Sequence, residues 1–343
     1  MKTIIKFLDF LSPLPNLKID KEDRFKNLLG GTISILSSIL IISLTVYFSK
    51  ELLTRTKSSI IFNYAPNENQ SQNISNFPYA LVLTNSYGQP LADDSRVYSV
   101  YSVINTLYTN YSSTTPITTI KTQTIEQEKC DINKHFGNYT QNFKNIPFLS
   151  SFYCQVPHAN NLTINSTFGS INAVYMAHHI LRCVNDTSKN ITNCRDPKYI
   201  ESTLATAFVG FWFLEYSLNH DSIAQPGYIT LRSDALPSSS TVYSRNWYYI
   251  TNIAYRSDMG LIFEDILEQK YFYYTRPTQT VDLTFQGTLQ GGLASIFISM
   301  DQKYEVYKRY FTKIQNLIAD IGGMIKGVIT VSQIIVYYFN TNL

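Results

Sequence analysis

Residues 28–49 read LLGGTISILSSILIISLTVYFS, and no charged residue lies between Lys26 and Lys50. As an α-helix, such a run is roughly 35 Å long and can cross a hydrocarbon core of about 30 Å. The run is too long for the apolar part of a cleaved signal peptide, and residues 1–26 precede it. The sequence therefore predicts a first transmembrane helix over residues 27–49 that acts as an uncleaved signal anchor.

A second apolar run, Ile321 to Phe339, lies near the other end of the chain. It predicts a juxtamembrane segment and a second transmembrane helix over residues 313–339, with residues 340–343 as a cytosolic tail. Residues 50–312 are polar through Ser, Thr, Asn and Tyr, and only 15% of all residues are charged, against about 25% in soluble domains. This middle region is long enough to form a domain with a sizeable core.

The distribution of basic residues predicts the orientation of the chain. Lys2, Lys6, Lys18, Lys21, Arg24 and Lys26 precede the first span, whereas only Lys50, Arg55 and Lys57 follow it closely. Because the more basic flank stays in the cytosol, both termini are predicted to be cytosolic and residues 50–312 lumenal or extracellular. Residues 1–26 carry an apolar helical face that favours an interfacial segment on the cytosolic side, in contact with membrane lipids. The alternative is a tail that becomes ordered on a partner.

Glycosylation signals support the same topology. Eight Asn-x-Ser/Thr sequons occur in the middle region: Asn69, Asn73, Asn110, Asn138, Asn161, Asn165, Asn185 and Asn190. Their number, together with the cysteines, favours a glycoprotein of the secretory pathway or the cell surface. No sequon follows Asn190, so the second half of the domain is expected to face the membrane, a partner subunit or the core.

The four cysteines, Cys130, Cys154, Cys183 and Cys194, all lie in the middle region. An even number confined to this region predicts two disulfide bonds in an oxidising compartment. Three pairings are possible, and Cys130–Cys154 with Cys183–Cys194 is favoured because short loops close at the lowest entropic cost. The alternatives are four free buried thiols or, less favoured, a zinc site.

Small residues recur in both spans. Gly30, Ser34 and Ser38 repeat every four residues in the first span, and Gly323 and Gly327 form a Gly-x-x-x-Gly motif in the second. Such spacing lets helix backbones approach closely in lipid, so these faces are predicted to pack, within one chain or between chains. Alternatively, the glycines only loosen or bend the helix.

Lys326 lies within the second span, deeper than Asp320, which is expected near the outer interface. An intramembrane lysine is costly and indicates a functional role. It can face a water-filled path or pair with a partner's carboxylate. The alternative is that its stem reaches toward the outer headgroups.

Short alternating runs rich in Val, Ile, Thr, Tyr and Phe predict β-strands in the middle region. They are residues 77–84, 97–103, 228–232, 241–250 and 271–275, with a hairpin over 280–300 that turns near Gly291-Gly292. Residues 105–128 suit a long strand or an exposed loop, and 171–184 and 260–269 are the best helix candidates. The predicted fold is two transmembrane α-helices plus a mainly β, antiparallel sandwich-like ectodomain with few short helices.

No catalytic motif or cofactor site is predicted. His178-His179 near Cys183 suggests a metal site, but adjacent residues point different ways on any regular element. Glu264-Asp265 more closely resembles a solvated helix face than an acid–base pair. The aromatic stretch at residues 208–216 suits a core strand, a segment near the bilayer or a binding surface. A net charge of +3 without a basic run argues against nucleic acid as a partner.

Several motifs at the two ends resemble those of a known family. They are FLDF (7–10), LGGTISIL (29–36) and Lys50-Glu51, then SIFISMDQKYEVYKRYF (295–311) and LIADIGGMI (317–325). The chain thus resembles the ER-to-Golgi vesicle cargo-receptor (ERGIC-type) family over about 80 residues, counted from these motifs and their flanks. Its layout is also similar to that of two-pass membrane proteins of ciliates. The resemblance implies two spans, a β-rich lumenal domain and a cargo-binding hetero-oligomer, although the short tail lacks the family's sorting signals.

These observations predict a non-enzymatic, glycosylated two-pass membrane protein whose ectodomain binds other proteins. It would act as a cargo receptor or as a subunit of a membrane protein assembly, in the ER and Golgi or at the cell or ciliary surface. The alternative is a subunit of a trimeric, two-span ligand-gated ion channel, for which Lys326 is the best support. A surface hydrolase would need a nucleophile or metal near His178-His179, for which the sequence gives no reason.

Overall fold

The computed structural model describes residues 28–55, 57–66, 71–75, 78–110, 117–156, 162–166, 172–185, 193–238, 242–283 and 291–342. The chain divides into two compact units. The first consists of residues 1–61, 256–268 and 307–343, and the second of residues 62–255 and 269–306. Residues 1–26, where an interfacial helix is predicted, lie outside the described residues, as does Leu343.

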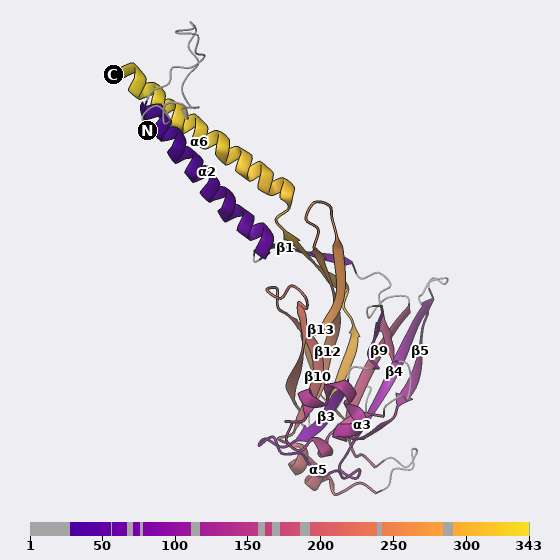
Figure 1. Ribbon diagram of the computed structural model, residues 1–343. Helices are drawn as coiled ribbons and strands as arrows, with labels where there is room; N and C mark the ends of the chain where they lie inside the picture. Colours follow the sequence, from indigo (N-terminus) through magenta and orange to yellow (C-terminus); the bar gives the residue numbers. More distant parts are fainter. Residues whose placement is uncertain are drawn as a thin grey trace. The chain divides into compact units, whose positions relative to one another are not determined.

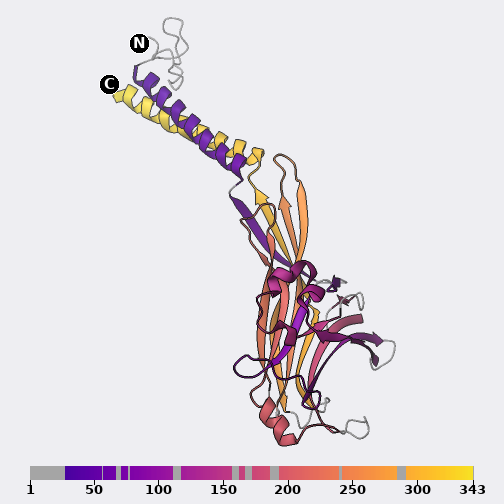
Figure 2. The same cartoon turned by 60° about the horizontal axis from the view of Figure 1, so that its bottom comes forward.

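The first unit contains two long helices, α2 (Leu28–Thr54) and α6 (Ile314–Asn342), which lie side by side in both views (Figures 1 and 2). Residues Gly31–Thr54 and Ile314–Tyr338 have a mean hydropathy of 1.9 and 1.4 in their most apolar windows. Only 17% and 6% of these windows are buried, so neither helix is covered like a core helix. Both are long enough to span a membrane.

Both helices extend beyond the predicted spans. α2 continues past residue 49 because Lys50, Glu51, Leu52 and Leu53 are good helix formers. It ends at Thr54, and the next residue, Arg55, adopts a left-handed conformation (φ 50°) and donates its backbone N–H to the carbonyl of Glu51. Likewise, α6 includes residues 340–342, which were expected to form a separate tail.

The larger sheet has the strand order β1-β15-β12-β14-β9-β4-β5. These strands are β1 (Ser58–Pro66), β15 (Lys303–Phe311), β12 (Val242–Asp258), β14 (Gly292–Met300), β9 (Asn172–Arg182), β4 (Tyr98–Asn110) and β5 (Ile117–Ile125). In addition, β13 (Ile266–Leu283) pairs with β12, and β8 (Thr163–Asn165) joins β2 (Ser71–Asn73) to β9.

The smaller sheet is antiparallel and has the order β11-β10-β3-β7-β6. Its strands are β11 (Gly227–Pro237), β10 (Phe208–Leu218), β3 (Tyr79–Thr84), β7 (Tyr153–Gln155) and β6 (Gln127–Lys129). The short helices are α3 (Ile132–His135), η1 (Gly137–Tyr139), α4 (Thr140–Phe143), η2 (Leu149–Ser151) and α5 (Pro197–Leu204).

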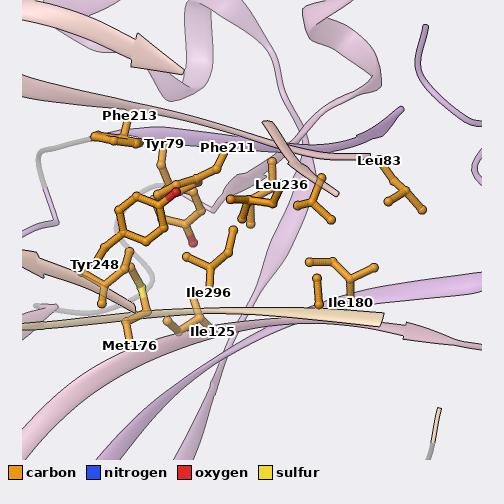
Figure 3. Close-up of a cluster of buried hydrophobic side chains, with 14 of the residues drawn as sticks. Tyr79, Leu83, Ile125, Met176, Ile180, Phe211, Phe213, Leu236, Tyr248 and Ile296 are labelled. Atoms are coloured by element: carbon orange, nitrogen blue, oxygen red, sulfur yellow. The ribbon is translucent and has the colours of Figure 1, made fainter. Parts of the chain in front are cut away.

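The main core of the second unit lies between the two sheets (Figure 3). Phe211 and Phe213 of β10 face Tyr248 of β12 with ring centroids 5.3 and 5.7 Å apart. Met176 of β9 and Ile296 of β14 complete the opposing layer and are buried. Large aromatic and aliphatic side chains thus fill the space between two sheets. Two long apolar helices at the ends and a mainly β domain with few short helices confirm the predicted fold class.

The strands expected within residues 77–84, 97–103, 228–232, 241–250 and 271–275 are confirmed, although Phe77 and Thr241 lie outside the described residues. Residues 105–128 include the end of β4 and all of β5. The two helix predictions are wrong. Residues 172–182 form β9, whose apolar side chains are covered on both sides and so do not alternate with polar ones. Residues 260–265 form a loop, and β13 begins at Ile266.

The pairing of two strands also differs from the prediction. β14 does not form a hairpin with β13 over residues 280–300 but lies between β12 and β9. Its contact with β12 is parallel, from Ser244↔Ala294 to Ile250↔Met300, so the larger sheet is mixed rather than antiparallel. Period-two alternation identifies strands, but it does not determine which strands become neighbours.

Both disulfides follow the favoured pairing. Cys130–Cys154 joins the residue after β6 to the middle of β7, beside a second buried cluster that includes Phe136 and Phe143. Cys183–Cys194 closes the loop that follows β9. No cysteine is left free.

Candidate functional site

The two long helices pack through small side chains. Ser37 Oγ of α2 and Ser332 Oγ of α6 are 2.7 Å apart in a buried hydrogen bond. Ser34 and Val336 are buried in the same contact face. Ser38 is half-buried, and its Oγ donates to the carbonyl of Ser34 at 2.8 Å. Small residues at these positions allow the close approach that stabilises helix pairs in lipid.

The Gly-x-x-x-Gly motif does not take part in this contact. Gly323 and Gly327 are exposed, and a Cβ atom added at either position would meet no atom within 4 Å. Ser332 lies nine positions after Gly323 in the sequence. That spacing is about two and a half turns, which places the two on opposite sides of α6. The prediction that these glycines pack against the first span is therefore wrong within this chain. Gly30 belongs to α2, and its contacts are outside what the structure describes.

Polar and small side chains cover the side of α6 that faces away from α2. We call this surface the polar face of α6. It consists of Asn316, Gly323, Lys326, Gly327, Thr330 and Gln333, all exposed. Ala319, Ile334 and Tyr337 are exposed on the same side, so the face becomes more apolar toward the end of α6. Lys326 lies near its middle, and its backbone carbonyl accepts a 2.8 Å hydrogen bond from Thr330 Oγ1.

The exposed side of α2 has the opposite character. Leu36, Ile39, Ile42 and Val46 are each more than half exposed, with fractions of 66, 56, 63 and 65%. Such a surface suits hydrocarbon, whereas a lysine, an amide and a hydroxyl are costly there. Contact with water, with a polar partner or, for Lys326, with the lipid headgroups would lower this cost.

The two histidines that suggested a metal site point to opposite sides of β9. His178 lies between the two sheets, where its Nδ1 is 2.5 Å from Ser102 Oγ and its ring is 4.6 Å from that of Tyr79. His179 lies on the other side, with Nδ1 2.6 Å from Ser295 Oγ. Each imidazole thus has its own hydroxyl partner, and the two cannot bind one ion together.

Burial keeps both imidazoles neutral. It lowers the pKa of His178 to about 3, with a smaller contribution from His179, and lowers the pKa of His179 to about 4. Among the residues that the structure describes, no three His, Cys, Asp or Glu side chains lie close enough to hold a metal ion.

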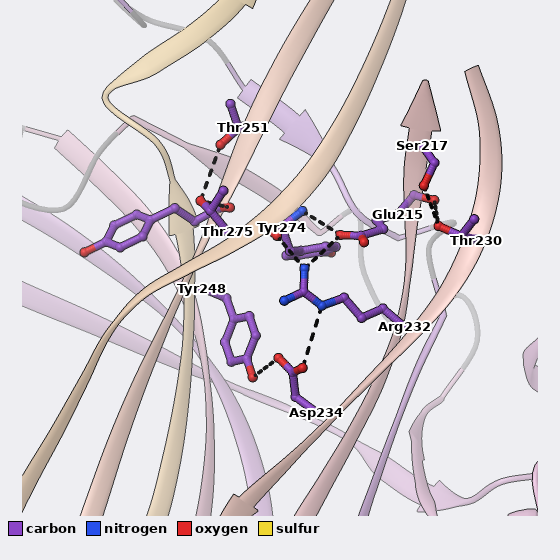
Figure 4. A network of polar contacts seen from close by, with 10 residues as sticks. Glu215, Ser217, Thr230, Arg232, Asp234, Tyr248, Thr251, Tyr274 and Thr275 are labelled. Carbon is purple, nitrogen blue, oxygen red and sulfur yellow. Dashed lines mark hydrogen bonds and ion pairs between the residues drawn. The ribbon is translucent and has the colours of Figure 1, made fainter. Parts of the chain in front are cut away.

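A polar network that the sequence gave no sign of connects the two sheets (Figure 4). Arg232 of β11 lies 3.6 Å from Glu215 and 3.7 Å from Asp234, measured from Nη1 and Nε to the nearest carboxylate oxygens. Tyr248 donates its hydroxyl to Asp234 at 2.7 Å, and the backbone N–H of Tyr274 donates to Glu215 at 3.2 Å. Burial raises the pKa of Glu215, and the backbone N–H of Tyr274 and the Arg232 guanidinium partly offset this rise. The network links β10 and β11 of the smaller sheet to β12 and β13 of the larger one.

Glu264 and Asp265 lie in the loop between β12 and β13 rather than on a helix. The backbone N–H of Asp265 donates to Asp258 Oδ1 at 3.0 Å, so this residue takes part in holding the loop closed. Residues 208–216 belong to β10, a strand that contributes Phe211 and Phe213 to the core. They are therefore a core strand, one of the three possibilities considered.

Five of the eight sequons fall on described residues. Asn73, Asn110, Asn138 and Asn185 are exposed, and Asn165 is half-buried with its Oδ1 accepting the N–H of Val174 at 3.0 Å. Asn69, Asn161 and Asn190 lie outside the described residues.

These features define a class: a two-span membrane protein with a disulfide-bonded, β-rich domain between its spans. The chain belongs to the family described as "Uncharacterised 80 kDa protein N-terminal domain", whose model matches residues 80–301. No curated protein sequence matches it. Nothing in these comparisons gives evidence for the cargo-receptor resemblance.

Among solved structures, the chain is similar to a cryo-EM structure of a proton-activated chloride channel. The sequence identity is 10% and the TM-score 0.31, and the match covers 91% of this chain and 99% of that chain. A likeness at this level says nothing about what the present chain conducts or binds.

Proposed function

We propose that this protein is a subunit of an oligomeric ion channel in which the polar face of α6 lines a water-filled path. The observation that carries the proposal is the contrast between the two helices. The exposed side of α2 is mainly apolar, with Thr32 and Ser43 as exceptions, whereas the side of α6 that faces away from α2 carries Lys326, Thr330 and Gln333 beside Ile334 and Tyr337. Hydration of that face removes the cost of placing these groups in hydrocarbon.

One pair of helices cannot enclose a path, so the proposal requires several copies. Arranging the copies with α6 inside and α2 outside places polar groups in water and apolar groups in lipid. Gly323 and Gly327 leave space at the axis of such an assembly. A ring of Lys326 ammonium groups would attract anions and repel cations, so we expect the path to prefer anions.

Cysteine accessibility tests the water-filled path without requiring that the channel be open. All four native cysteines form disulfides, so an introduced thiol has a clean background. In membranes, Thr330→Cys should react with a charged, water-soluble thiol reagent, whereas Ile42→Cys on the lipid-facing side of α2 should not. Equal protection of both thiols would contradict an aqueous path.

Conductance tests the charge preference. For purified protein in a planar bilayer with a KCl gradient, we expect a reversal potential closer to the equilibrium potential of Cl⁻ than to that of K⁺. Because Lys326→Glu reverses the local charge, it should move the reversal potential toward that of K⁺, while Lys326→Arg should leave its sign unchanged. A reversal potential that is the same for all three proteins would exclude Lys326 from the path.

A second candidate function is that of a non-enzymatic subunit whose domain binds other proteins in a hetero-oligomeric membrane assembly. The exposed edge strand β1 favours it, because Ile60, Ile61, Phe62 and Tyr64 are 37 to 60% exposed at the end of the larger sheet. Cross-linking from position 61, followed by mass spectrometry of the native complex, distinguishes the two. Unlike partners in fixed ratio support this function, whereas a complex of identical chains supports the channel.

A further inference from the structure

The turn between β12 and β13 exposes a group of apolar side chains. We call residues 259–265 the β12–β13 loop. Within it, Leu261, Ile262 and Phe263 are 45, 49 and 82% exposed, and β13 continues the group with Ile266 and Leu267 at 55 and 50%. Consecutive exposed residues of this kind form a surface that water solvates poorly, so they indicate an interaction site.

The loop is attached to the beginning of α6. The backbone N–H of Ile314 donates to the carbonyl of Leu261 at 3.0 Å, and Gln315 Nε2 donates to the carbonyl of Ile262 at 2.7 Å. Ile314 and Gln315 form the first turn of the predicted span Ile314–Tyr338. The turn also lies beside that end of α6 in both views (Figures 1 and 2).

A network of hydrogen bonds gives the loop a fixed shape. Asp258 Oδ1 accepts the backbone N–H groups of Gly260 and Asp265, both at 3.0 Å. Lys313 Nζ, one residue before α6, is 2.8 Å from Asp258 Oδ2. A side chain at Gly260 would collide with the carbonyl oxygen of Phe263, 1.7 Å from an added Cβ. The loop is therefore held to the end of the span rather than free to fold back over its apolar residues.

We infer that the β12–β13 loop inserts into the headgroup layer of the membrane, where Phe263 and its neighbours contact lipid. The two hydrogen bonds set Leu261 and Ile262 at the level where α6 enters the membrane, and aromatic side chains are favoured at that interface. Glu264, the next residue, is exposed and charged, which restricts the insertion to a shallow depth. The inference depends on the two spans and not on whether the protein conducts ions.

The test uses the full-length protein in liposomes of zwitterionic lipid. Phe263→Cys is labelled with a nitroxide, and its collision rates with oxygen, which concentrates in lipid, and with a water-soluble nickel chelate are measured by electron paramagnetic resonance. Tyr87→Cys is the matched control, because Tyr87 is an aromatic residue of similar exposure, 88%, in a turn of the second unit. We expect the ratio of oxygen to nickel collisions to be several-fold higher at position 263.

Two outcomes would overturn the inference. A ratio equal to that at position 87 would place the loop in water. Protection from both reagents would place it against protein, either a second copy or another subunit. Because all cysteines of the wild-type chain are paired, the label reports only the introduced site. Ile262→Cys provides a second position in case the variant at 263 elutes differently from wild type in size-exclusion chromatography.

Discussion

His178 and His179 are neighbours in β9, yet each is buried on a different side of the sheet and bound to a different serine. Their environments have the same electrostatic effect. Removing an imidazole from water disfavours its charged form, and neither histidine has a carboxylate among its hydrogen-bond partners to offset this. The folded protein therefore holds two neutral histidines that the unfolded chain would protonate in mildly acidic solution.

This difference predicts a loss of stability in acid. The folded pKa values are about 3 and about 4, below the unfolded value of about 6.5. The contribution of the neutral histidines to the free energy of unfolding is therefore complete above about pH 6.5. It is lost as the pH falls toward 4, at about 1.4 kcal/mol per pH unit for each histidine that stays fully neutral in the folded state. Thermal unfolding of the full chain in detergent between pH 7.5 and 4.5 measures it.

The control for this prediction is His179→Asn, which retains a hydrogen-bonding side chain beside Ser295. This variant should be less stable than the wild type at neutral pH. Its free energy of unfolding should fall with decreasing pH at about half the histidine-dependent rate, since one of the two neutral histidines remains. A melting temperature of the wild type that does not change between pH 7 and 5 would contradict the burial of neutral imidazoles.

At the residue scale, the sequence predicted cysteine pairing but not polar contacts. The two disulfides close short loops, so chain entropy alone favours them. Arg232, Glu215 and Asp234 meet because of the β10–β11 register, which places Phe213 opposite Arg232 and Phe211 opposite Asp234. No spacing in the sequence reveals that register, so the network was not predictable.

At the scale of elements, the contact between α2 and α6 depends on serines rather than on the glycine motif. Ser37 and Ser332 face each other across the contact, 2.7 Å apart at their Oγ atoms. We predict that Ser37→Cys combined with Ser332→Cys forms a disulfide within one chain when membranes are treated with a mild oxidant. Cleavage between the helices, followed by electrophoresis without reductant, detects the linked fragments.

The pair Ser37→Cys and Gly323→Cys is the control, because Gly323 lies on the opposite side of α6. It should give no link within a chain. A link at this control pair with none at 37 and 332 would mean that α6 is rotated by about half a turn from the described arrangement.

The elements themselves were largely predictable, but their partners were not. Length and lack of charge predict the two spans, and alternation predicts β3, β4, β11 and β12. β9 was mistaken for a helix because both of its faces are covered, which removes the alternation that distinguishes a strand. The position of β14 depends on a parallel pairing with β12 from a distant part of the chain, which local pattern cannot indicate.

At the scale of the whole molecule, the predicted topology puts the sequons where N-glycans are added. Asn138 is exposed on η1, so it should carry a glycan. We predict that enzymatic removal of N-glycans increases the gel mobility of the protein from its native membrane. Asn138→Gln should reproduce one step of this increase.

Asn133→Gln provides a control, since Asn133 is exposed on neighbouring α3 but is followed by Lys134 and His135 and so is not a sequon. It should leave mobility unchanged. If enzymatic deglycosylation has no effect on the wild type, the domain does not face the lumen or the cell exterior, and the proposed orientation of both spans is wrong.

The place of β14 has a consequence for synthesis on the ribosome. β14 is an inner strand of the larger sheet, between β12 and β9, although it is encoded near the end of the domain. Until residue 300 has left the ribosome, the sides of β9 and β12 that β14 later covers stay unpaired. Such edges invite pairing with other chains. A nascent chain that stalls before residue 292 should therefore depend on chaperones, and truncated products should aggregate rather than persist as a smaller soluble domain.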